Sequence, residues 1–436
     1  MTAPHAAGAL RRLSPGLALL IFVALMLAVP KPARPLAPAP VLSGIERAGA
    51  VSLARDCGYS APLPGSPGRS LWLFCDTPVY ARTAGGWALR RFIAGSTAAA
   101  GPVGPGGVPG ALTEVGTPGA PGARGARGAR GAQGRAGAPG SPAPFLAAPA
   151  GLVTPAGLPC GSDGSYAASW ASGVARVPST PELLVTFNNY CVLAASRSAR
   201  VGQAAARPLG VSRSARVGQA AARPLGGSGG FLYEGFGVAE YDPATGTLTG
   251  DVTVFAGPDD GAPMLLGSPV FSGRYLYLYG PACAARRAGR CAGTVFEARV
   301  PATAAAWTDP LSYRWRTGGG SASWTADAAL AGPVIAGPSP AGVSVGSYPA
   351  AGRRFVLIEQ TSIDGAFTVY GSAAPDGTWK RIMSGRVPCR RAAGYANFCR
   401  AIIGHPELST RGQIVLSYFD PAAGPHGHVM VAGFRW

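Results

Sequence analysis

The chain has 436 residues and a formal net charge of +18, from 38 Lys and Arg against 20 Asp and Glu. This charge would suit an anionic polymer or a membrane surface, although the almost exclusive use of Arg equally fits a GC-rich genome. No zinc-finger spacing, basic helix or RNA-binding aromatic motif accompanies it, so we predict no nucleic-acid partner. With 47% hydrophobic residues, 65 Gly and 42 Pro, the composition indicates a large core joined by many turns.

The N-terminal residues have the pattern of an export signal. Arg11 and Arg12 precede an apolar run from Leu17 to Val29, which is shorter than the roughly 20 residues of a membrane span. We therefore assign residues 1–40 to a signal peptide, or to an uncleaved membrane anchor, followed by a Pro/Ala-rich linker. In either case the remainder, residues 41–436, is predicted to be a single exported domain that is secreted or attached to the cell surface.

Eight cysteines occur in the chain, and an even number in an exported protein indicates disulfides. Consecutive pairing is the simplest of many connectivities. No C-x-x-C is present, and the four histidines lack zinc-site spacing, so we predict neither a metal site nor a cofactor and leave open only a structural cation at the hub. The predicted pairs are Cys57–Cys75, Cys160–Cys191, Cys283–Cys291 and Cys389–Cys399.

A loose repeat of short apolar strands and Gly- or Pro-marked turns runs along the chain. Its copies cover residues 56–77, 166–190, 267–280, 342–362 and 404–421. A further strand pair follows each copy, for example FGVAEYDPATGTLTGDVTVF and FTVYGSAAPDGTWKRI. About four strands per copy predict an all-β, five-bladed β-propeller with long loop insertions, and a β-sandwich is the alternative. We expect the final strand, GHVMVAGFRW, to close the ring beside the N-terminal blade.

Two low-complexity insertions interrupt this domain, at residues 101–142 and 196–230. The first has Gly at every third position from Gly116 to Gly140, which is the period of collagen, and a trimer built on it would tie three propellers together. The second contains SRSARVGQAAARPLG twice. We predict that both are flexible surface loops and that the protein is a monomer.

The first copy of the repeat contains two aspartates in a distinctive arrangement. A hairpin centred on Ser66 places Cys57 opposite Cys75 and Asp56 opposite Asp76. Because side chains alternate between faces, both carboxylates would share one face and the disulfide would lie on the other. Two close carboxylates repel, so the pKa of one should be high, which suits an acid and base pair or a cation site.

The segments DCGYS and LWLFCDT of this hairpin resemble the opening of a family of secreted bacterial propellers, long catalogued as a domain of unknown function. Some of its members are endo-D-arabinanases. LLVTFNNY, GSPVF followed by YLYLYG, EQTS, and HPELS followed by IVLSYFDP are also similar to that group. The resemblance implies that Asp56 and Asp76 are the catalytic carboxylates. The chain departs from the family at Cys57 and Cys75, where a small residue such as Gly is common.

Further candidate site residues lie near the ends of predicted inner strands. Glu359 and Glu407 are candidate additional acids, with an exit-loop salt bridge and a blade-packing hydrogen bond as their alternative roles. Aromatic and amide side chains would suit a carbohydrate cleft, although each is also a common core or rim residue. These candidate substrate-binding residues are Tyr59, Trp72, Asn188, Asn189, Tyr279, His405 and Tyr418. Asp376 lies in SAAPDGTW, which resembles the structural Asp-box turn of sialidase-like propellers, so we assign it no catalytic role.

These features predict an exported glycoside hydrolase-like propeller that acts on a furanosidic, arabinan-like glycan of the cell envelope or the environment. The alternatives are a non-catalytic carbohydrate-binding or scaffold propeller, and a propeller held on an anionic surface by its Arg-rich loops. No G-x-S-x-G elbow, P-loop or HExxH occurs, so serine hydrolase, NTPase and zincin functions lack support.

Overall fold

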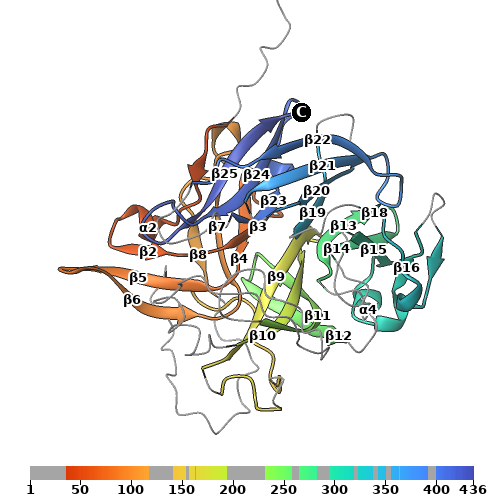
Figure 1. Ribbon diagram of the computed structural model, residues 1–436, viewed down its shortest axis with the longest axis horizontal. Helices are drawn as coiled ribbons and strands as arrows, with labels where there is room; N and C mark the ends of the chain where they lie inside the picture. Colours follow the sequence, from red (N-terminus) through yellow and green to blue (C-terminus); the bar gives the residue numbers. More distant parts are fainter. Residues whose placement is uncertain are drawn as a thin grey trace, which may run out of the picture. The chain divides into compact units, whose positions relative to one another are not determined.

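Antiparallel ladders connect all the named strands of the computed structural model, which describes twelve stretches of the chain (Figure 1). These are residues 36–116, 141–153, 157–162, 164–193, 231–257, 265–281, 294–318, 323–336, 342–349, 355–362, 364–390 and 399–436. The predicted export signal, the predicted Cys283–Cys291 pair, most of the collagen-like segment and the duplicated segment lie outside the described residues.

Five sheets contain four or more strands each, and we number them in chain order. The first sheet consists of β3 (Cys57–Pro62), β4 (Arg69–Phe74), β7 (Thr97–Pro102) and β8 (Thr113–Val115). The second consists of β9 (Tyr166–Arg176), β10 (Leu183–Val192), β11 (Phe231–Asp242) and β12 (Thr247–Ala256). The third consists of β13 (Gly267–Ser272), β14 (Tyr275–Pro281), β15 (Thr294–Pro301), β16 (Arg314–Arg316), β17 (Trp324–Thr325) and β18 (Ile335–Ala336).

The fourth sheet consists of β19 (Gly342–Ser347), β20 (Phe355–Gln360), β21 (Ala366–Ser372) and β22 (Lys380–Arg386). The fifth consists of β23 (Arg400–Gly404), β24 (Gln413–Asp420), β25 (His428–Arg435) and β1 (Ala39–Pro40). A smaller sheet holds β2 (Val51–Leu53), β5 (Thr77–Thr83) and β6 (Gly86–Ile93). Single helical turns complete the described residues: α2 (Gly44–Arg47), η1 (Pro105–Gly107), α4 (Ala304–Trp307), η4 (Pro310–Ser312), η5 (Ala328–Leu330) and η6 (Pro406–Leu408).

Consecutive sheets pack face to face, and each interface has its own apolar cluster. Leu73 meets Phe187 between the first and second sheets, and Val254 meets Leu278 between the second and third. Corresponding clusters lie between the third and fourth, the fourth and fifth, and the fifth and first sheets. The first strands of the five sheets, β3, β9, β13, β19 and β23, contact one another in the same cyclic order.

Burial along each sheet explains the sequence pattern. The second strands are apolar on both faces because each face meets a neighbouring sheet, and every residue of β24 is buried. The outer strands β12 and β22 are mostly exposed and carry polar residues. The prediction of an all-β chain built from units of about four strands is confirmed, including the hairpins β11–β12 and β21–β22.

The last strand closes on the N-terminal segment rather than on the first sheet. Ala39 and Pro40 pair with Val431 and Met430 of β25. The N-terminal residues thus provide the outer strand of the fifth sheet, whereas we expected β25 to pair beside the N-terminal blade. Both sides of β25 are hydrogen-bonded as a result, which removes an open sheet edge.

An arm formed by β5 and β6 follows β4 and precedes β7 in the chain and projects from the first sheet (Figure 1, orange). On its other edge β5 pairs with β2. The sequence analysis did not identify this arm. The start of the predicted first insertion is also ordered, because residues 101–115 contain the end of β7 and all of β8. Within the residues that are described, no helix has the length and apolar character needed to cross a membrane.

Candidate functional site

The hairpin of β3 and β4 has the predicted register over most of its length. Tyr59 pairs with Leu73 and Pro62 with Ser70, as a turn centred on Ser66 requires. A bulge at Gly58 then shifts the register by one residue, so Cys57 pairs with Phe74. The expected alignment of Asp56 opposite Asp76 is therefore wrong. Gly58 has a φ of +113°, and a Cβ there would lie 2.9 Å from Val429 Cγ1, so only Gly fits this bulge.

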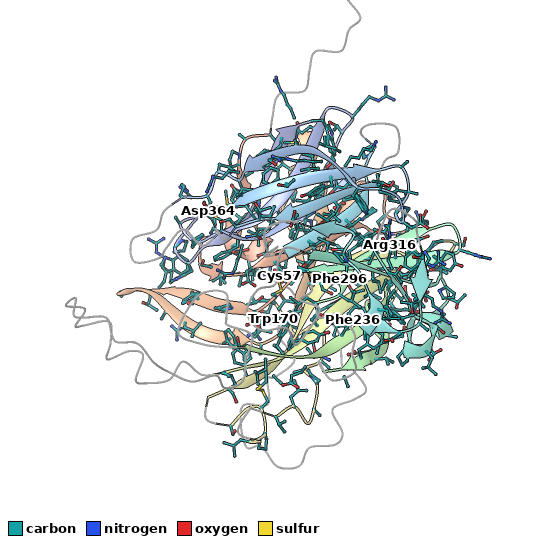
Figure 2. All side chains as sticks on the ribbon, turned by 45° about the vertical axis from the view of Figure 1, so that its right-hand side comes forward. Cys57, Trp170, Phe236, Phe296, Arg316 and Asp364 are labelled. Atoms are coloured by element: carbon teal, nitrogen blue, oxygen red, sulfur yellow. A yellow bond between two sulfur atoms is a disulfide. The ribbon has the colours of Figure 1, made fainter. Side chains whose placement is uncertain are left out.

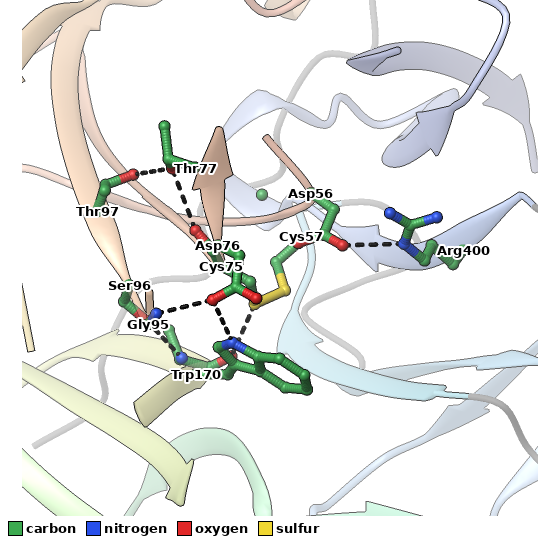
Figure 3. The surroundings of a disulfide bond; sticks show 12 residues. Asp56, Cys57, Cys75, Asp76, Thr77, Gly95, Ser96, Thr97, Trp170 and Arg400 are labelled. Carbon is green, nitrogen blue, oxygen red and sulfur yellow. Dashed lines mark hydrogen bonds and ion pairs between the residues drawn. A yellow bond between two sulfur atoms is a disulfide. The ribbon is translucent and has the colours of Figure 1, made fainter. Parts of the chain in front are cut away.

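Three predicted disulfides are present among the described residues. Cys57 is joined to Cys75 with a Cα–Cα distance of 5.5 Å, Cys160 to Cys191, and Cys389 to Cys399. The bulge still allows the first of these bonds because a disulfide tolerates Cα separations of about 4.4–6.8 Å. Cys57 begins β3 and Cys75 follows the end of β4, so this disulfide joins the two chain segments that carry Asp56 and Asp76 (Figure 3).

Replacement of both Cys57 and Cys75 by Ser is expected to lower the free energy of unfolding by about 2–4 kcal/mol, because the open chain gains conformational entropy. Urea denaturation of the oxidised proteins measures the change. The matched control replaces both Cys160 and Cys191 by Ser. This pair closes a loop of 31 residues, compared with 18 for the first pair, so its loss in free energy of unfolding should be comparable. An unchanged midpoint for the Cys57/Cys75 variant would contradict the prediction.

Asp76 lies between β4 and β5, at the base of the arm, where three donors converge on its carboxylate. Gly95 N and Trp170 Nε1 donate to Oδ1 at 2.7 and 2.8 Å, and Tyr166 Oη donates to Oδ2 at 2.6 Å. Burial raises the pKa of Asp76 to about 6, and the charge of Asp56 adds to the increase, while the three hydrogen bonds oppose it. The carboxyl group can therefore change protonation state near neutral pH.

Asp56 has a different environment on the other side of the disulfide. Arg400 Nε, on β23, donates to Asp56 Oδ2 at 2.9 Å and connects the first and fifth sheets (Figure 3). The guanidinium of Arg400 also lies 4.0 Å from the ring centroid of Phe419. The Asp56 side chain is 25% exposed. Asp56 therefore has a cationic partner, whereas the donors on the Asp76 carboxylate, Gly95, Tyr166 and Trp170, are all neutral.

Tyr59 is half-buried and connects this region to a central cavity. Burial and the charge of Asp56 raise the pKa of Tyr59 to about 12, so its hydroxyl remains protonated. The cavity has a volume of about 370 Å³. The five first strands or the residues that follow them supply its wall, which includes Tyr59, Ser60, Arg176 and Glu407.

Glu407 lies at this cavity wall, with His405 buried behind it. His405 Nδ1 is 2.6 Å from Ser60 Oγ, and Ser60 Oγ donates to Glu407 Oε1. His405 is fully buried against the Trp72 ring, with centroids 4.8 Å apart. Because Ser60 is on β3 and Glu407 follows β23, this network joins the first and fifth sheets, which is the blade-packing role considered for Glu407.

Glu359 is on β20, the second strand of its sheet, and is fully buried. Tyr370 Oη donates to it at 3.1 Å, and burial raises its pKa. Its side chain shares a strand face with Leu357, which packs between the third and fourth sheets. The structure therefore does not bring Glu359 together with Asp56 and Asp76.

The remaining predicted substrate-binding residues are packed in the interior. Asn188 donates to Leu266 O, Asn189 donates to Thr253 Oγ1, and Tyr279 donates to Pro375 O. Each of these side chains is less than 5% exposed, as are Trp72 and Tyr418. The side chains of Asn188, Asn189 and Tyr279 thus bind neighbouring segments of the protein, as buried polar groups do in protein cores. Tyr59 alone of the seven predicted residues is half-buried.

Three side chains that contact the aspartates, and the backbone of Gly95, were missed by the sequence analysis. The side chains are those of Tyr166, Trp170 and Arg400. The first two are within the second copy of the repeat, and aromatic residues near its start were the available signal. Among the described residues, Asp56 with Cys57 and Cys75 is the one group whose potential metal-binding atoms cluster, within 4.8 Å. Both sulfurs are in the disulfide, so they offer no thiolate ligand.

No protein-family model matches the chain, and no curated protein matches its sequence. Similar solved structures include a candidate hydrolase from Bacteroides ovatus, with 14% identity, a TM-score of 0.49 and coverage of 87% of this chain and 85% of that one. A GH43_1 enzyme from Xanthomonas citri has 12% identity and a TM-score of 0.41, covering 91% and 90%. An exo-beta-1,3-galactanase from Phanerochaete chrysosporium has 9% identity and a TM-score of 0.39, covering 92% and 63%. At these values we infer neither activity nor substrate from the similarity.

Proposed function

We propose that the protein is an exported, monomeric, five-bladed propeller that hydrolyses a furanosidic, arabinan-like glycan. The observation that carries this proposal is the unequal environment of Asp56 and Asp76 on either side of the Cys57–Cys75 disulfide. Glycoside hydrolysis requires one carboxyl group that donates a proton and one that is ionised. The half-buried Asp76, whose pKa is about 6, and the Arg400-paired Asp56 suit these two roles.

Three further observations support the architecture and the compartment. The cyclic contacts of the five first strands and the five apolar clusters between consecutive sheets support a ring of five blades. The pairing of β1 with β25 supports its closure. The three disulfides support an oxidising compartment outside the cytosol, either in secreted form or with the N-terminal segment as a membrane tether.

In the proposed reaction Asp76 donates a proton to the leaving glycosidic oxygen. Gly95 N and Trp170 Nε1 can only donate, so they hold Oδ1 as an acceptor. Tyr166 Oη can both donate and accept, so it can reverse its hydrogen bond when Oδ2 carries the proton. Asp56 then supplies the ionised carboxylate, either as a nucleophile or as the base that activates water.

Reducing-sugar release from a panel of furanose and pyranose polysaccharides tests the proposal directly. We expect release from arabinan by the unmodified protein and none by the Asp56→Asn/Asp76→Asn double variant. Absence of release from every polysaccharide by the correctly folded, unmodified protein would refute the enzymatic function.

The pH dependence of kcat/KM gives a second test. Because Asp76 must be protonated to act as the acid, kcat/KM should decline as the pH rises through about 6. Initial rates between acid and mildly alkaline pH measure this decline, and a rate that rises steadily above neutral pH would exclude Asp76 as the acid.

A non-catalytic carbohydrate-binding propeller is the second candidate. Both aspartates already have protein partners, which favours a structural role for them. In that case the double Asn variant should bind glycans with undiminished affinity, and the unmodified protein should release no sugar. Binding of labelled arabinan to both proteins distinguishes the two functions.

A further inference from the structure

The arm formed by β5 and β6 begins and ends at the candidate acid. Asp76 directly precedes β5, and Gly95, whose N–H binds the Asp76 carboxylate, lies two residues after β6. Thr77 lies at the start of the arm and Thr97 lies just beyond its end. Their hydroxyl oxygens are 2.8 Å apart, so a hydrogen bond joins the two ends of the arm. Side chains at the base of the arm therefore lie beside Asp76.

Phe92, at the base of β6, is 43% exposed. The other large hydrophobic side chains that are exposed in the described residues are aliphatic, so Phe92 is the one aromatic ring among them. Its ring meets the ring of Tyr166 edge to face, with centroids 5.2 Å apart and an interplanar angle of 76°. The hydroxyl of Tyr166 in turn donates to Asp76 at 2.6 Å. Tyr166 therefore contacts both the exposed Phe92 ring and the Asp76 carboxyl group.

A second aromatic pair lies on the Oδ1 side of the same carboxylate. Trp170 is half-buried, donates to Asp76 Oδ1, and packs on Tyr190 with centroids 4.5 Å apart. Asp76 therefore has aromatic rings next to both of its oxygens. Sugar rings present apolar C–H faces, and aromatic side chains that combine flat apolar area with polar partners suit such ligands.

The arm is held in place, so Phe92 is positioned before any ligand arrives. The Arg91 guanidinium donates to Pro142 O, and the Tyr80 ring stacks on His426 with centroids 3.5 Å apart. A side chain fixed in its binding position loses little conformational entropy when a ligand binds.

We propose that Phe92, together with Tyr166, forms a subsite that stacks a sugar residue of a neutral oligosaccharide next to the residue cleaved at Asp76. This inference rests on the proposed function and extends it to the substrate, because a separate stacking position favours chains of several residues over disaccharides.

Isothermal titration of arabinofuranosyl oligosaccharides into the inactive Asp56→Asn protein tests the subsite without catalysis. Adding Phe92→Ala should weaken hexasaccharide binding by about ten-fold, since loss of a stacked contact exposes apolar surface, and should leave disaccharide binding within about two-fold. Phe92→Trp should restore hexasaccharide affinity. Ile382→Ala on β22, where Ile382 is 41% exposed, is the matched control and should change neither.

In the active protein, Phe92→Ala should raise KM for the hexasaccharide by a similar factor and leave kcat nearly unchanged. Equal hexasaccharide affinity with and without Phe92→Ala, or equal weakening for both chain lengths, would overturn the subsite. If the unmodified protein cleaves no glycan but hexasaccharide binding still depends on Phe92, the hydrolase proposal fails and the subsite stands. If cleavage occurs and Phe92→Ala has no effect, the subsite alone fails. If no oligosaccharide binds, both fail.

Discussion

Replacement of Asp76 by Asn is expected to lower kcat on a cleavable arabinan by about 10²–10⁴-fold. Asn has nearly the same shape and can still accept hydrogen bonds from Trp170 Nε1 and Gly95 N through its amide oxygen. It cannot donate a proton to a leaving oxygen, so the loss should appear in kcat more than in KM. Steady-state rates on a defined oligosaccharide measure the effect.

Stability measurements separate this catalytic loss from misfolding. The pKa of Asp76 is about 6 in the folded protein, whereas an unfolded Asp has a pKa near 3.9. The folded state holds a proton that the unfolded state has lost between these values, so the contribution of Asp76 to stability is full below about pH 4 and is lost as the pH rises to 6. Asn should remove this dependence without unfolding the protein.

Asp242→Asn is the matched control for that variant. Asp242 caps the exposed turn between β11 and β12, where its carboxylate accepts from Ala244 N and Thr245 Oγ1, and Asn can make the same turn. We expect an unchanged rate. A fully active Asp76→Asn protein would remove Asp76 from the mechanism, whatever the result for Asp56.

Replacement of Arg316 by Ala is expected to lower the free energy of unfolding by about 1–3 kcal/mol, because it leaves the buried Glu297 side chain without this donor. Burial raises the pKa of Glu297 to about 8, so the carboxyl group can take up a proton instead of remaining an unpaired charge. Arg316 Nη1 lies 2.8 Å from Glu297 Oε2, and both side chains are almost completely buried. The same nitrogen donates to Gly377 O at 3.1 Å, in the turn between β21 and β22, so Arg316 also connects the third and fourth sheets. Figure 2 labels Arg316 among the side chains of the protein. Urea denaturation followed by tryptophan fluorescence measures the loss.

Two controls identify burial as the cause. Arg386→Ala breaks the pair with Asp364, whose side chains are 58% and 35% exposed, and should cost less than about 1 kcal/mol. The double variant Arg316→Met/Glu297→Leu removes both charges and should recover much of the stability lost in Arg316→Ala. Equal losses in the free energy of unfolding for Arg316→Ala and Arg386→Ala would show that burial does not increase the contribution of the Arg316–Glu297 pair to stability.

The strands were predictable because apolar runs and turn residues are local properties. The β3–β4 register followed from a Pro- and Gly-rich turn around Ser66, which fixes the pairing of Tyr59 with Leu73. The bulge at Gly58 was not predictable, because its need for Gly comes from a contact with Val429, which is remote in the sequence. The β5–β6 arm was missed since its strands resemble those of any blade.

The candidate site was predictable only in part for the same reason. Asp56, Asp76 and their disulfide are close in sequence, whereas Trp170 is 94 residues from Asp76 and Arg400 is 344 residues from Asp56. Tyr279 and Tyr418 occur near strand ends, as ligand-binding aromatics do, but their sheets pack on neighbouring sheets there. Sequence patterns do not distinguish an aromatic residue at a strand end that faces a neighbouring sheet from one that faces solvent.

The pairing of β1 with β25 has a consequence for the order in which the polypeptide folds. Ala39 and Pro40 are far in sequence from their hydrogen-bonding partners Val431 and Met430. The fifth sheet therefore cannot be completed until these two distant segments meet. Pairing over such a long separation carries a large entropic barrier, so this step should be slow and should leave an edge of β25 unpaired until that moment.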